Sequence, residues 1–304
     1  MKNNPLLICV VGPTAIGKTT LAIQIAKFFS TEIISADSRQ FYKEMSIGTA
    51  VPTKEELNTI KHHFIQNRSI FDDYNVGEFE RDALLLLGKL FKQNPVIVMV
   101  GGSGLYVDAV VKGLDTFPKV SSEIRDQLKS DFESSGIEFL QKELQKNDPE
   151  YFKKADIDNH HRVIRALGIC RATGLSYSSF LNSEKEPREF ETLYIGLTAD
   201  REIVYDRINR RVDIMMNEGL EIEAKELHQY KSLNAMQTVG YKELFSYFDG
   251  VLSKKEAVEE IKKNTRRFAK RQGTWYRKNE AIKWFNIKTN FKEVIEYINN
   301  APSN

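Results

Sequence analysis

An eight-residue segment near the amino terminus restricts the possible folds more than any other part of the chain. Residues 12–19 read Gly-Pro-Thr-Ala-Ile-Gly-Lys-Thr and match the pattern G-x-x-x-x-G-K-[ST]. An apolar run at 6–11 precedes the segment, and a run with helical spacing begins at residue 19. In a strand–loop–helix of this kind, backbone N–H groups and the amino terminus of the helix surround a phosphate. The segment therefore predicts a P-loop that binds a diphosphate with its metal, and by itself it does not indicate a nucleotide.

Short apolar runs alternate with amphipathic segments along most of the chain. Strands are predicted at 6–11, 32–35, 96–100, 192–197 and 282–285, and helices at 19–30, 76–93, 104–111, 201–212 and 256–277. Most of the strand runs are continuously apolar, which is typical of a parallel sheet that is covered on both faces. Residues 121–180 have helical spacing and no strand-like run. The fold class is therefore predicted as α/β: a P-loop NTPase-like, doubly wound parallel sheet (1–115 and 190–304) with an inserted all-helical subdomain (116–189).

The composition is that of a folded, water-soluble protein. Of the 304 residues, 41% are hydrophobic and 28% are charged. The longest apolar runs, 6–11 and 96–100, are far shorter than the roughly 20 residues that a membrane-spanning helix needs, and the amino terminus lacks the cleavage site of a signal peptide. Cys9 and Cys170 provide neither a disulfide framework nor a C-x-x-C metal motif. We therefore expect a cytoplasmic protein with no membrane partner.

Positive charge is concentrated in one stretch near the carboxyl terminus. Residues 262–278 contain eight basic side chains and no acidic one, whereas the whole chain has a net charge of +2, so the remainder carries −6. Phe268, Trp275 and Tyr276 lie among these cations. A focused basic stripe with interleaved aromatic residues is typical of a nucleic-acid-binding surface, because cations neutralise phosphates and aromatic rings stack on bases. A solvated helix face is the alternative reading of such a stripe.

The catalytic chemistry predicted from the residues centres on Asp37. An ATPase or GTPase normally places a carboxylate after a second apolar strand to hold Mg²⁺, but the run at 96–100 ends in Gly101-Gly102-Ser103-Gly104. The base-reading motif N-K-x-D and the switch motif D-x-x-G are both absent from the sequence. Asp37 follows the strand predicted at 32–35, and a carboxylate at the carboxyl edge of a sheet is placed to act as a general base over the phosphate site.

Seven segments, in this order, resemble the tRNA dimethylallyltransferases of bacterial type, also called tRNA isopentenyltransferases. They are the P-loop at 12–19, Asp-Ser-Arg-Gln-Phe-Tyr at 37–42, Ile-Gly-Thr-Ala-Val-Pro at 47–52, His62-His63, Gly-Gly-Ser-Gly-Leu-Tyr at 101–106, Gln-Thr-Val-Gly-Tyr-Lys at 237–242 and Lys-Arg-Gln-Gly-Thr-Trp-Tyr-Arg at 270–277. The resemblance extends over almost the whole chain. Phe41 and Ser103 depart from it, since the family usually has an aliphatic residue and a threonine there.

The resemblance implies transfer of a dimethylallyl group from dimethylallyl diphosphate to N6 of the adenosine next to the anticodon on its 3′ side. It assigns catalytic roles to Asp37, Lys18 and Arg207, with Asp37 as the general base, and it implies Mg²⁺ as the cofactor, held by Thr19. The residues that it assigns to diphosphate binding are Gly12, Pro13, Thr14, Ala15, Ile16, Gly17, Lys18, Thr19, Ser103 and Arg207. The same loop is typical of nucleotide-binding and ATP-binding proteins.

The second partner that the resemblance implies is the anticodon stem-loop of tRNA, whose target base must be extruded from the loop to reach the P-loop. The residues that it assigns to tRNA are Asp37, Ser38, Arg39, Gln40, Ser103, Arg125, His161, Arg162, Val163, Ile164, Arg165, Gln237, Thr238, Val239, Gly240, Tyr241, Lys242, Lys270, Arg271, Gln272, Trp275 and Arg277. A monomer is expected, because one chain contains all of these groups.

Three other functions are compatible with parts of the sequence. A P-loop kinase of small molecules or nucleotides would use the P-loop and the arginine-rich segment 207–211 as a lid, but it would leave the basic stripe unexplained. A cytokinin-type transferase acting on free adenine nucleotides would not need the helical insertion. A non-catalytic RNA-binding module would have no use for the P-loop and Asp37.

Overall fold

The computed structural model describes residues 4–301, which divide into two compact units. Of the described residues, 4–112 and 188–301 form the first unit, and 113–187 form the second. In the first unit, the described strands make one parallel sheet in the order β3-β2-β4-β1-β5-β6. The strands are β1 (Leu6–Val11), β2 (Ile33–Ser35), β3 (His62–His63), β4 (Val96–Val100), β5 (Glu191–Thr198) and β6 (Ile282–Asn286).

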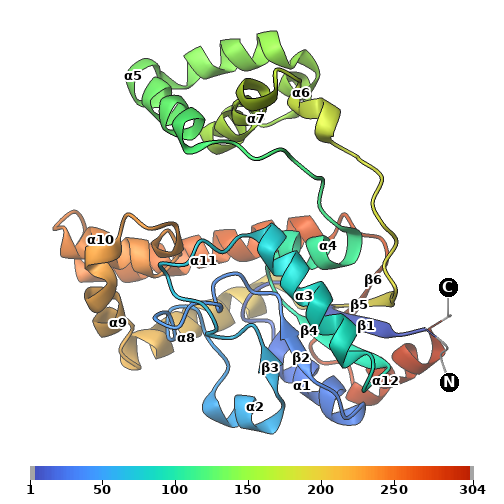
Figure 1. Cartoon of the computed structure of the whole chain (residues 1–304). Coiled ribbons are helices and arrows are strands. Elements are labelled where there is room, and N and C mark those ends of the chain that lie inside the picture. Colours follow the sequence, from blue (N-terminus) through green and yellow to red (C-terminus); the bar gives the residue numbers. More distant parts are fainter. Residues whose placement is uncertain (1–3, 302–304) are drawn as a thin grey trace. The chain divides into compact units, whose positions relative to one another are not determined.

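The helices of the first unit lie on both faces of this sheet and beside it (Figure 1). They are α1 (Lys18–Phe28), α2 (Lys54–Thr59), α3 (Val76–Leu90), α4 (Gly104–Lys112), α8 (Arg201–Asn217), α9 (Leu220–Leu227), α10 (Tyr241–Phe248), α11 (Lys254–Tyr276) and α12 (Phe291–Asn300). The five predicted core helices are all present, with their ends shifted by a few residues. β3, α2, α9, α10 and α12 were not predicted, because most of them are too short for a periodic pattern to be recognised.

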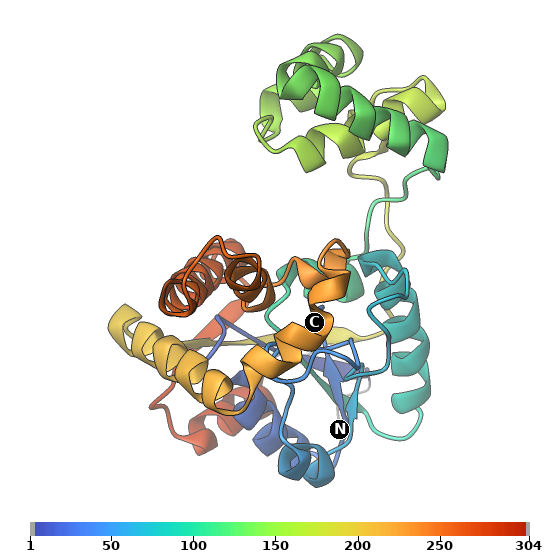
Figure 2. The same ribbon diagram turned by 90° about the vertical axis from the view of Figure 1, so that its left-hand side faces the viewer.

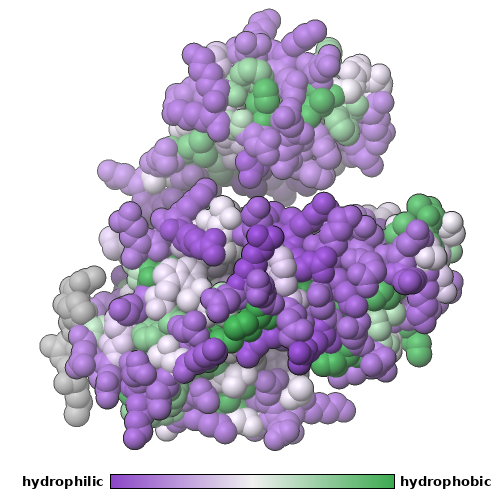
Figure 3. Space-filling model, turned by 180° about the vertical axis from the view of Figure 1, so that it is seen from behind, coloured by the Kyte–Doolittle hydropathy of each residue, from purple (hydrophilic) through white to green (hydrophobic). Residues whose placement is uncertain are grey.

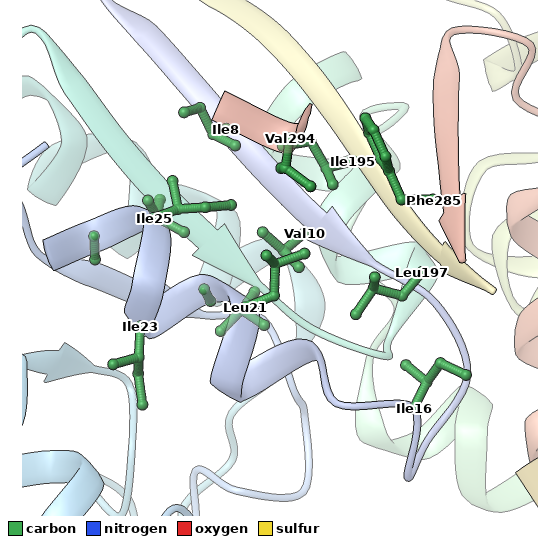
Figure 4. Packing of buried hydrophobic residues seen from close by; sticks show 14 of the residues in the cluster. Ile8, Val10, Ile16, Leu21, Ile23, Ile25, Ile195, Leu197, Phe285 and Val294 are labelled. Carbon is green, nitrogen blue, oxygen red and sulfur yellow. The ribbon is translucent and has the colours of Figure 1, made fainter. Parts of the chain in front are cut away.

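β1 lies at the centre of the sheet, and all six of its residues are buried. Leu6, Ile8 and Val10 face one side, where they pack with α1 and α12. Figure 4 shows this side, with Leu21 and Ile25 of α1, Val294 of α12 and Ile195 of β5 near the even-numbered residues of β1. The odd-numbered residues pack on the other side with α3 and α4. A strand covered on both faces must be apolar throughout, which explains the continuous run in the sequence.

The strand order brings three loops together at the carboxyl edge of the sheet. β1 lies between β4 and β5, and β2 lies beside β4. The loops that follow β1, β2 and β4 therefore begin next to one another. Ala36 N donates to Val100 O (2.7 Å), and Gly101 N donates to Val10 O (3.3 Å). A Cβ atom on Gly101 would lie 2.3 Å from Ala36 O, so only glycine permits this close approach. Ligands of doubly wound sheets bind at such an edge.

The helices α8, α9, α10 and α11 form a layer beside the sheet, and Figure 2 shows this group from the side. Their core includes Val212, Leu220, Tyr241 and Ile261. α11 begins with a capping box, in which the Ser253 hydroxyl accepts the N–H of Glu256 and the Glu256 carboxylate accepts the N–H of Ser253. The carboxyl-terminal half of α11 carries the basic stripe and reaches the edge of the sheet.

The second unit contains helices and no strand among its described residues. It contains α5 (Ser122–Asn147), α6 (Pro149–Lys154), α7 (His160–Thr173) and the 3₁₀ turn η1 (Tyr177–Phe180), and α5 is kinked at Gly136, where φ is 76°. Buried Asp148 organises this unit, since its carboxylate accepts the N–H groups of Tyr151 (2.9 Å) and Ser178 (2.6 Å). Its core includes Leu128, Leu140, Leu144 and Leu167.

The unit begins and ends two to three residues earlier than the predicted 116–189. Arg188 belongs to the first unit because its guanidinium donates to Glu80 Oε1 (2.6 Å) and to Ala109 O (2.9 Å). Both side chains of the Arg188–Glu80 pair are 17% exposed. An ion pair of this kind fixes the chain more firmly than a fully exposed one.

The face drawn in Figure 3 is mostly hydrophilic, with hydrophobic residues in small separate groups. Between residues 4 and 301, no helix is both long and apolar enough to cross a membrane. The exposed apolar side chains include Phe71, Leu85, Phe139 and Ile222, which come from different elements. Scattered apolar residues of this kind are normal on a folded protein.

Candidate active site

The segment 12–19 has the backbone conformation of a phosphate-binding loop. Gly12 (φ 141°) and Gly17 (φ 105°) adopt positive φ values, and so does Ala15 (φ 64°). A Cβ atom on Gly12 would lie 2.8 Å from Leu197 O, so this position requires glycine for space as well as for conformation. α1 starts at Lys18, which aims the free N–H groups of its first turn into the loop. The predicted loop thus has the geometry of an anion site at a helix amino terminus.

Lys18 lies inside this loop and its ammonium is partly withdrawn from water. Its Nζ donates to Pro13 O over 2.8 Å. Burial lowers the pKa of Lys18 to about 8, an effect that the nearby Asp37 carboxylate opposes and that Arg211 adds to. Because a bound diphosphate would stabilise the protonated form of Lys18, this position favours an anionic ligand.

Asp37 lies two residues beyond β2, at the carboxyl edge of the sheet. Its Oδ1 accepts the backbone N–H of Arg39 (3.1 Å), which fixes the orientation of the carboxyl group. Burial raises the pKa of Asp37, while the hydrogen bond from Arg39 and the charges of Lys18 and Arg211 act in the opposite direction. A half-buried carboxylate with a raised pKa is a stronger proton acceptor than an exposed one.

Two cavities meet at Asp37, both within the first unit. One has a volume of about 530 Å³ and is lined by the P-loop residues Lys18 and Thr19 together with Glu56 and His62. The other has a volume of about 410 Å³ and is lined by Ser38, Arg39, Ser103, Phe268 and Trp275. The residues that line both cavities are Thr14, Asp37, Thr49, Ala50, Gly102, Arg211 and Met215. Two ligands can therefore approach Asp37 from different cavities.

Arg211 is a site residue that the sequence reasoning missed. It lies one helical turn after Arg207 on α8 and lines both cavities beside Asp37. Burial lowers the pKa of Arg211, and the nearby carboxylates of Glu56 and Asp37 oppose this shift. The family-predicted Arg207 lines neither of these cavities. Its guanidinium donates instead to Ile16 O at the back of the P-loop (3.1 Å). The spacing of four residues places Arg211 on the same helix face as Arg207, and this spacing could have indicated from the sequence that Arg211 belongs to the site.

Ser103 and Gln40 organise the loops around Asp37. The Ser103 hydroxyl accepts the backbone N–H of Ser38 (3.2 Å) and lies 3.2 Å from the Ser38 hydroxyl. Gln40 Nε2 donates to Thr49 O (3.2 Å) and Ala50 O (2.8 Å). Three loops that are distant in sequence are thereby joined into one site.

The basic helix α11 is joined directly to the phosphate loop. The Gln272 side chain is buried; its Oε1 accepts the backbone N–H of Thr14 (2.8 Å), and its Nε2 donates to Gly102 O (2.9 Å). Trp275 Nε1 donates to Asp108 Oδ2 on α4 (2.9 Å). These contacts place the basic stripe beside the second cavity, where Phe268 and Trp275 are 38% and 44% exposed.

The residues predicted to contact tRNA differ in how far their side chains are exposed. Among those with exposed side chains are His161, Arg162 and Arg165 on α7, Gln237 and Lys242 near α10, and Lys270, Arg271, Trp275 and Arg277 on or next to α11. Val163, Tyr241 and Gln272 have buried side chains. Arg125 is exposed, and its guanidinium donates to Val120 O (2.8 Å). Ile164, Thr238 and Val239 are half-buried, and Gly240 begins α10 with φ 105°.

A model of the IPP transferase family matches residues 40–279. The chain belongs to this family. The match begins after the phosphate loop, β1, β2 and Asp37, and it includes β4, β5, the second unit and the layer α8 to α11.

Individual relatives agree with the family. The chain is 60% identical over 292 residues to the tRNA dimethylallyltransferase of Christiangramia forsetii, with 96% of this chain and 97% of the relative covered. A crystal structure of the tRNA isopentenylpyrophosphate transferase from Bacillus halodurans is similar with a TM-score of 0.71 and 36% identity, covering 97% and 95% of the two chains. A eukaryotic dimethylallyltransferase acting on tRNA has a TM-score of 0.79 and 26% identity, covering 98% of this chain and 76% of that one.

These findings confirm the predicted family and the P-loop NTPase-like α/β fold. They do not favour a kinase, since these relatives of the chain are named as transferases of prenyl groups. The missing carboxylate after β4, where Gly101 and Gly102 follow the strand, agrees with that outcome.

Proposed function

We propose that the protein transfers a dimethylallyl group from dimethylallyl diphosphate to N6 of the adenosine that follows the anticodon of tRNA. The observation that carries this proposal is the position of Asp37, on the common wall of two cavities of which one contains the phosphate loop. The names of the relatives supply the substrate class. All the protein residues that the proposal uses belong to one chain, so the enzyme would work as a monomer. A tRNA-modifying enzyme of this kind would work in the cytoplasm.

The diphosphate of the donor would occupy the P-loop in the first cavity. The allylic C–O bond breaks as the N6–C bond forms, and the electron pair of the C–O bond leaves with the diphosphate. Negative charge therefore grows on the leaving group, where the Lys18 ammonium, the Arg211 guanidinium and the N–H groups at the start of α1 can stabilise it. Asp37 would accept the proton that N6 loses.

The residues of the first cavity fit Mg²⁺. Thr19 places a hydroxyl beside Lys18 in the cavity. Among residues 4–301, there is no group of three or more His, Cys, Asp or Glu side chains that could hold a metal ion. Mg²⁺ typically takes few protein ligands and completes its coordination with phosphate oxygens and water. Thr19 would therefore hold the ion together with the diphosphate, and the ion would neutralise charge on the leaving group.

The second cavity suits an extruded purine. Phe268 and Trp275 provide aromatic surfaces on which a base can stack, and the backbone and hydroxyl of Ser38 lie near Asp37. The exposed cations of α11 lie beside this cavity and would neutralise phosphates of the anticodon stem-loop. The exposed His161, Arg162 and Arg165 of α7 would supply further contacts to RNA from the second unit.

A transfer assay tests the proposal. Purified protein, Mg²⁺ and radiolabelled dimethylallyl diphosphate are incubated with unmodified tRNA, with AMP, and separately with ATP and no prenyl donor. We expect label in tRNA and not in AMP. Label in AMP alone would indicate a cytokinin-type enzyme, and phosphate transfer from ATP would indicate a kinase.

Replacing Arg211 with alanine is expected to lower kcat/KM for dimethylallyl diphosphate by about 10- to 100-fold, because a half-buried guanidinium beside the leaving group is lost. Steady-state kinetics at saturating tRNA measure the effect. Arg210→Ala is the matched control, since Arg210 lies one residue away, is exposed and pairs with Asp206. Equal kinetics for the two variants would show that Arg211 does not act on the diphosphate.

Replacing Lys270 and Arg271 together with alanine is expected to weaken tRNA binding and to reduce its salt dependence. Each lost phosphate contact should lower the slope of log K against log salt concentration by about 1. Filter binding between 50 and 300 mM salt measures the slope. Lys288→Ala with Lys292→Ala is the control, because it removes the same charge from exposed positions next to and within α12. An unchanged slope in the first double variant would place the phosphate contacts elsewhere.

A further inference from the structure

Residues 46–50 form a single turn in the wall that the two cavities share. Ala50 N donates to Ile47 O (3.0 Å), and Thr49 and Ala50 line both cavities. Ala50 has φ 51°, in the left-handed region that an alanine seldom adopts. An isolated turn is unstable in water because few hydrogen bonds offset the cost of ordering it. The rest of the protein must therefore hold this part of the wall.

Glu223 of α9 holds the amino end of the turn. Its carboxylate accepts the backbone N–H groups of Ser46 (2.9 Å), Ile47 (2.8 Å) and Gly48 (3.0 Å). The first N–H groups of a helical turn have no partners within the turn, so an external acceptor is needed. A carboxylate is the strongest such acceptor that a protein can supply. One side chain thus satisfies three successive donors that lie some 175 residues away in the sequence.

Tyr241 fixes the position of this carboxylate and of the turn. Its hydroxyl donates to Glu223 Oε1 (2.6 Å), and its ring is fully buried. A Cβ atom on Gly48 would lie 2.5 Å from the ring, so the turn lies directly against the Tyr241 side chain. Gln40 holds the opposite end of the turn through the carbonyl groups of Thr49 and Ala50. The wall is therefore held at both ends by side chains from different elements.

We propose that Glu223 and Tyr241 are positioning residues that keep the wall formed by Thr49 and Ala50 closed around the reacting groups. The proposal rests on the function proposed above. Neither side chain lines the part of the site that contains Asp37, since neither contributes to the surface of the two cavities. The block 237–242, which the resemblance assigns to tRNA contact, would then also serve the interior of the site through Tyr241.

A wall that closes around the reacting groups limits the reaction of the donor with water. As the allylic C–O bond breaks, the carbon becomes electrophilic and can be attacked by N6 of adenosine or by a water molecule. In the second case a C–O bond to the water oxygen forms, diphosphate leaves, a proton passes to solvent and dimethylallyl alcohol results. A closed wall excludes water, and a loosened wall admits it. The share of alcohol among the products therefore reports on the wall.

The test compares Glu223→Gln and Tyr241→Phe with the unaltered protein. Glu223→Gln keeps the size of the side chain but puts an amide NH₂ in place of one acceptor oxygen, and Tyr241→Phe removes only the hydroxyl. Labelled dimethylallyl diphosphate and saturating tRNA are used, and labelled tRNA and labelled alcohol are both counted. We expect kcat for transfer to fall at least 10-fold in Glu223→Gln, the alcohol fraction to rise at least 5-fold in both variants, and the Kd for tRNA to stay within 2-fold.

Glu226→Gln provides the matched control, because Glu226 lies on the same helix with its side chain exposed. A kcat within 2-fold of the unaltered protein in Glu223→Gln would overturn the proposal. A lower kcat with an unchanged alcohol fraction would also overturn it, because a loss of folded enzyme lowers both products in proportion. A loss confined to tRNA affinity would assign the block to RNA binding. If the unaltered protein transferred no label, the proposed function would fail instead.

Discussion

Replacing Asp37 with asparagine lowers the turnover of tRNA prenylation by an expected two to four orders of magnitude, the range typical of a lost general base. The amide retains an oxygen that can accept the N–H of Arg39, as Oδ1 of Asp37 does over 3.1 Å. The local backbone should therefore keep its shape. What is lost is the capacity to take the proton from N6. Single-turnover measurements at saturating substrates report the chemical step.

Two further measurements distinguish a lost base from a damaged site. The Kd for tRNA should remain within about 3-fold, because the exposed cations of α11 are untouched. Asp73→Asn serves as the control, since Asp73 is an exposed carboxylate in a loop of the same unit. Because burial raises the pKa of Asp37, the rate of the unaltered enzyme should rise with pH as this group loses its proton. Near-normal turnover in Asp37→Asn would refute the role as base.

Replacing Lys18 with alanine is expected to lower kcat/KM for dimethylallyl diphosphate by about 100- to 1,000-fold. This corresponds to about 2.7–4 kcal/mol, the loss found when one fixed donor to a developing anion is removed. The ammonium lies inside the phosphate loop, where it would stabilise the charge on the departing diphosphate. Lys27→Ala at the exposed end of the same helix should leave the kinetics unchanged.

The pH dependence of the donor reaction provides an independent check on Lys18. Burial lowers its pKa to about 8 in the free enzyme, so the ammonium loses its charge as the pH rises through that value. The kcat/KM for the donor should therefore decline above about pH 8 in the unaltered protein. Lys18→Ala has no such group and should lack this decline. If both proteins showed the same alkaline limb, another group would be responsible for it.

Much of the fold follows from patterns that are local in the sequence. Leu6 to Val11 are apolar without interruption because β1 is buried on both faces. The glycine spacing at 12 and 17 reflects two positive φ values and one close approach to Leu197. β3 was not predicted because it consists of only two half-buried histidines, which form no apolar run; they pair with Ile33 and Ile34. α12 has buried residues at 294, 295 and 298, so closer attention to this helical spacing would have identified it.

The parts of the site that were missed depend on contacts between distant elements. Arg207 and Arg211 lie one turn apart on the same face of α8. Only the tertiary structure shows that Arg211 lines the two cavities and that Arg207 donates to Ile16 O at the back of the loop. Gln272 is separated from Thr14 by 258 residues, yet it holds the phosphate loop.

The sequence by itself therefore determined the phosphate loop, the family, the position of Asp37 after a strand and the basic stripe of α11. Each of these depends on backbone conformation, burial or charge within one short segment. Only the tertiary structure decided which side chains surround Asp37, since that depends on how helices separated by a hundred residues or more are rotated and packed. The Glu223 carboxylate shows the difference, because its three backbone partners around Ile47 have no side-chain signature that a sequence can display.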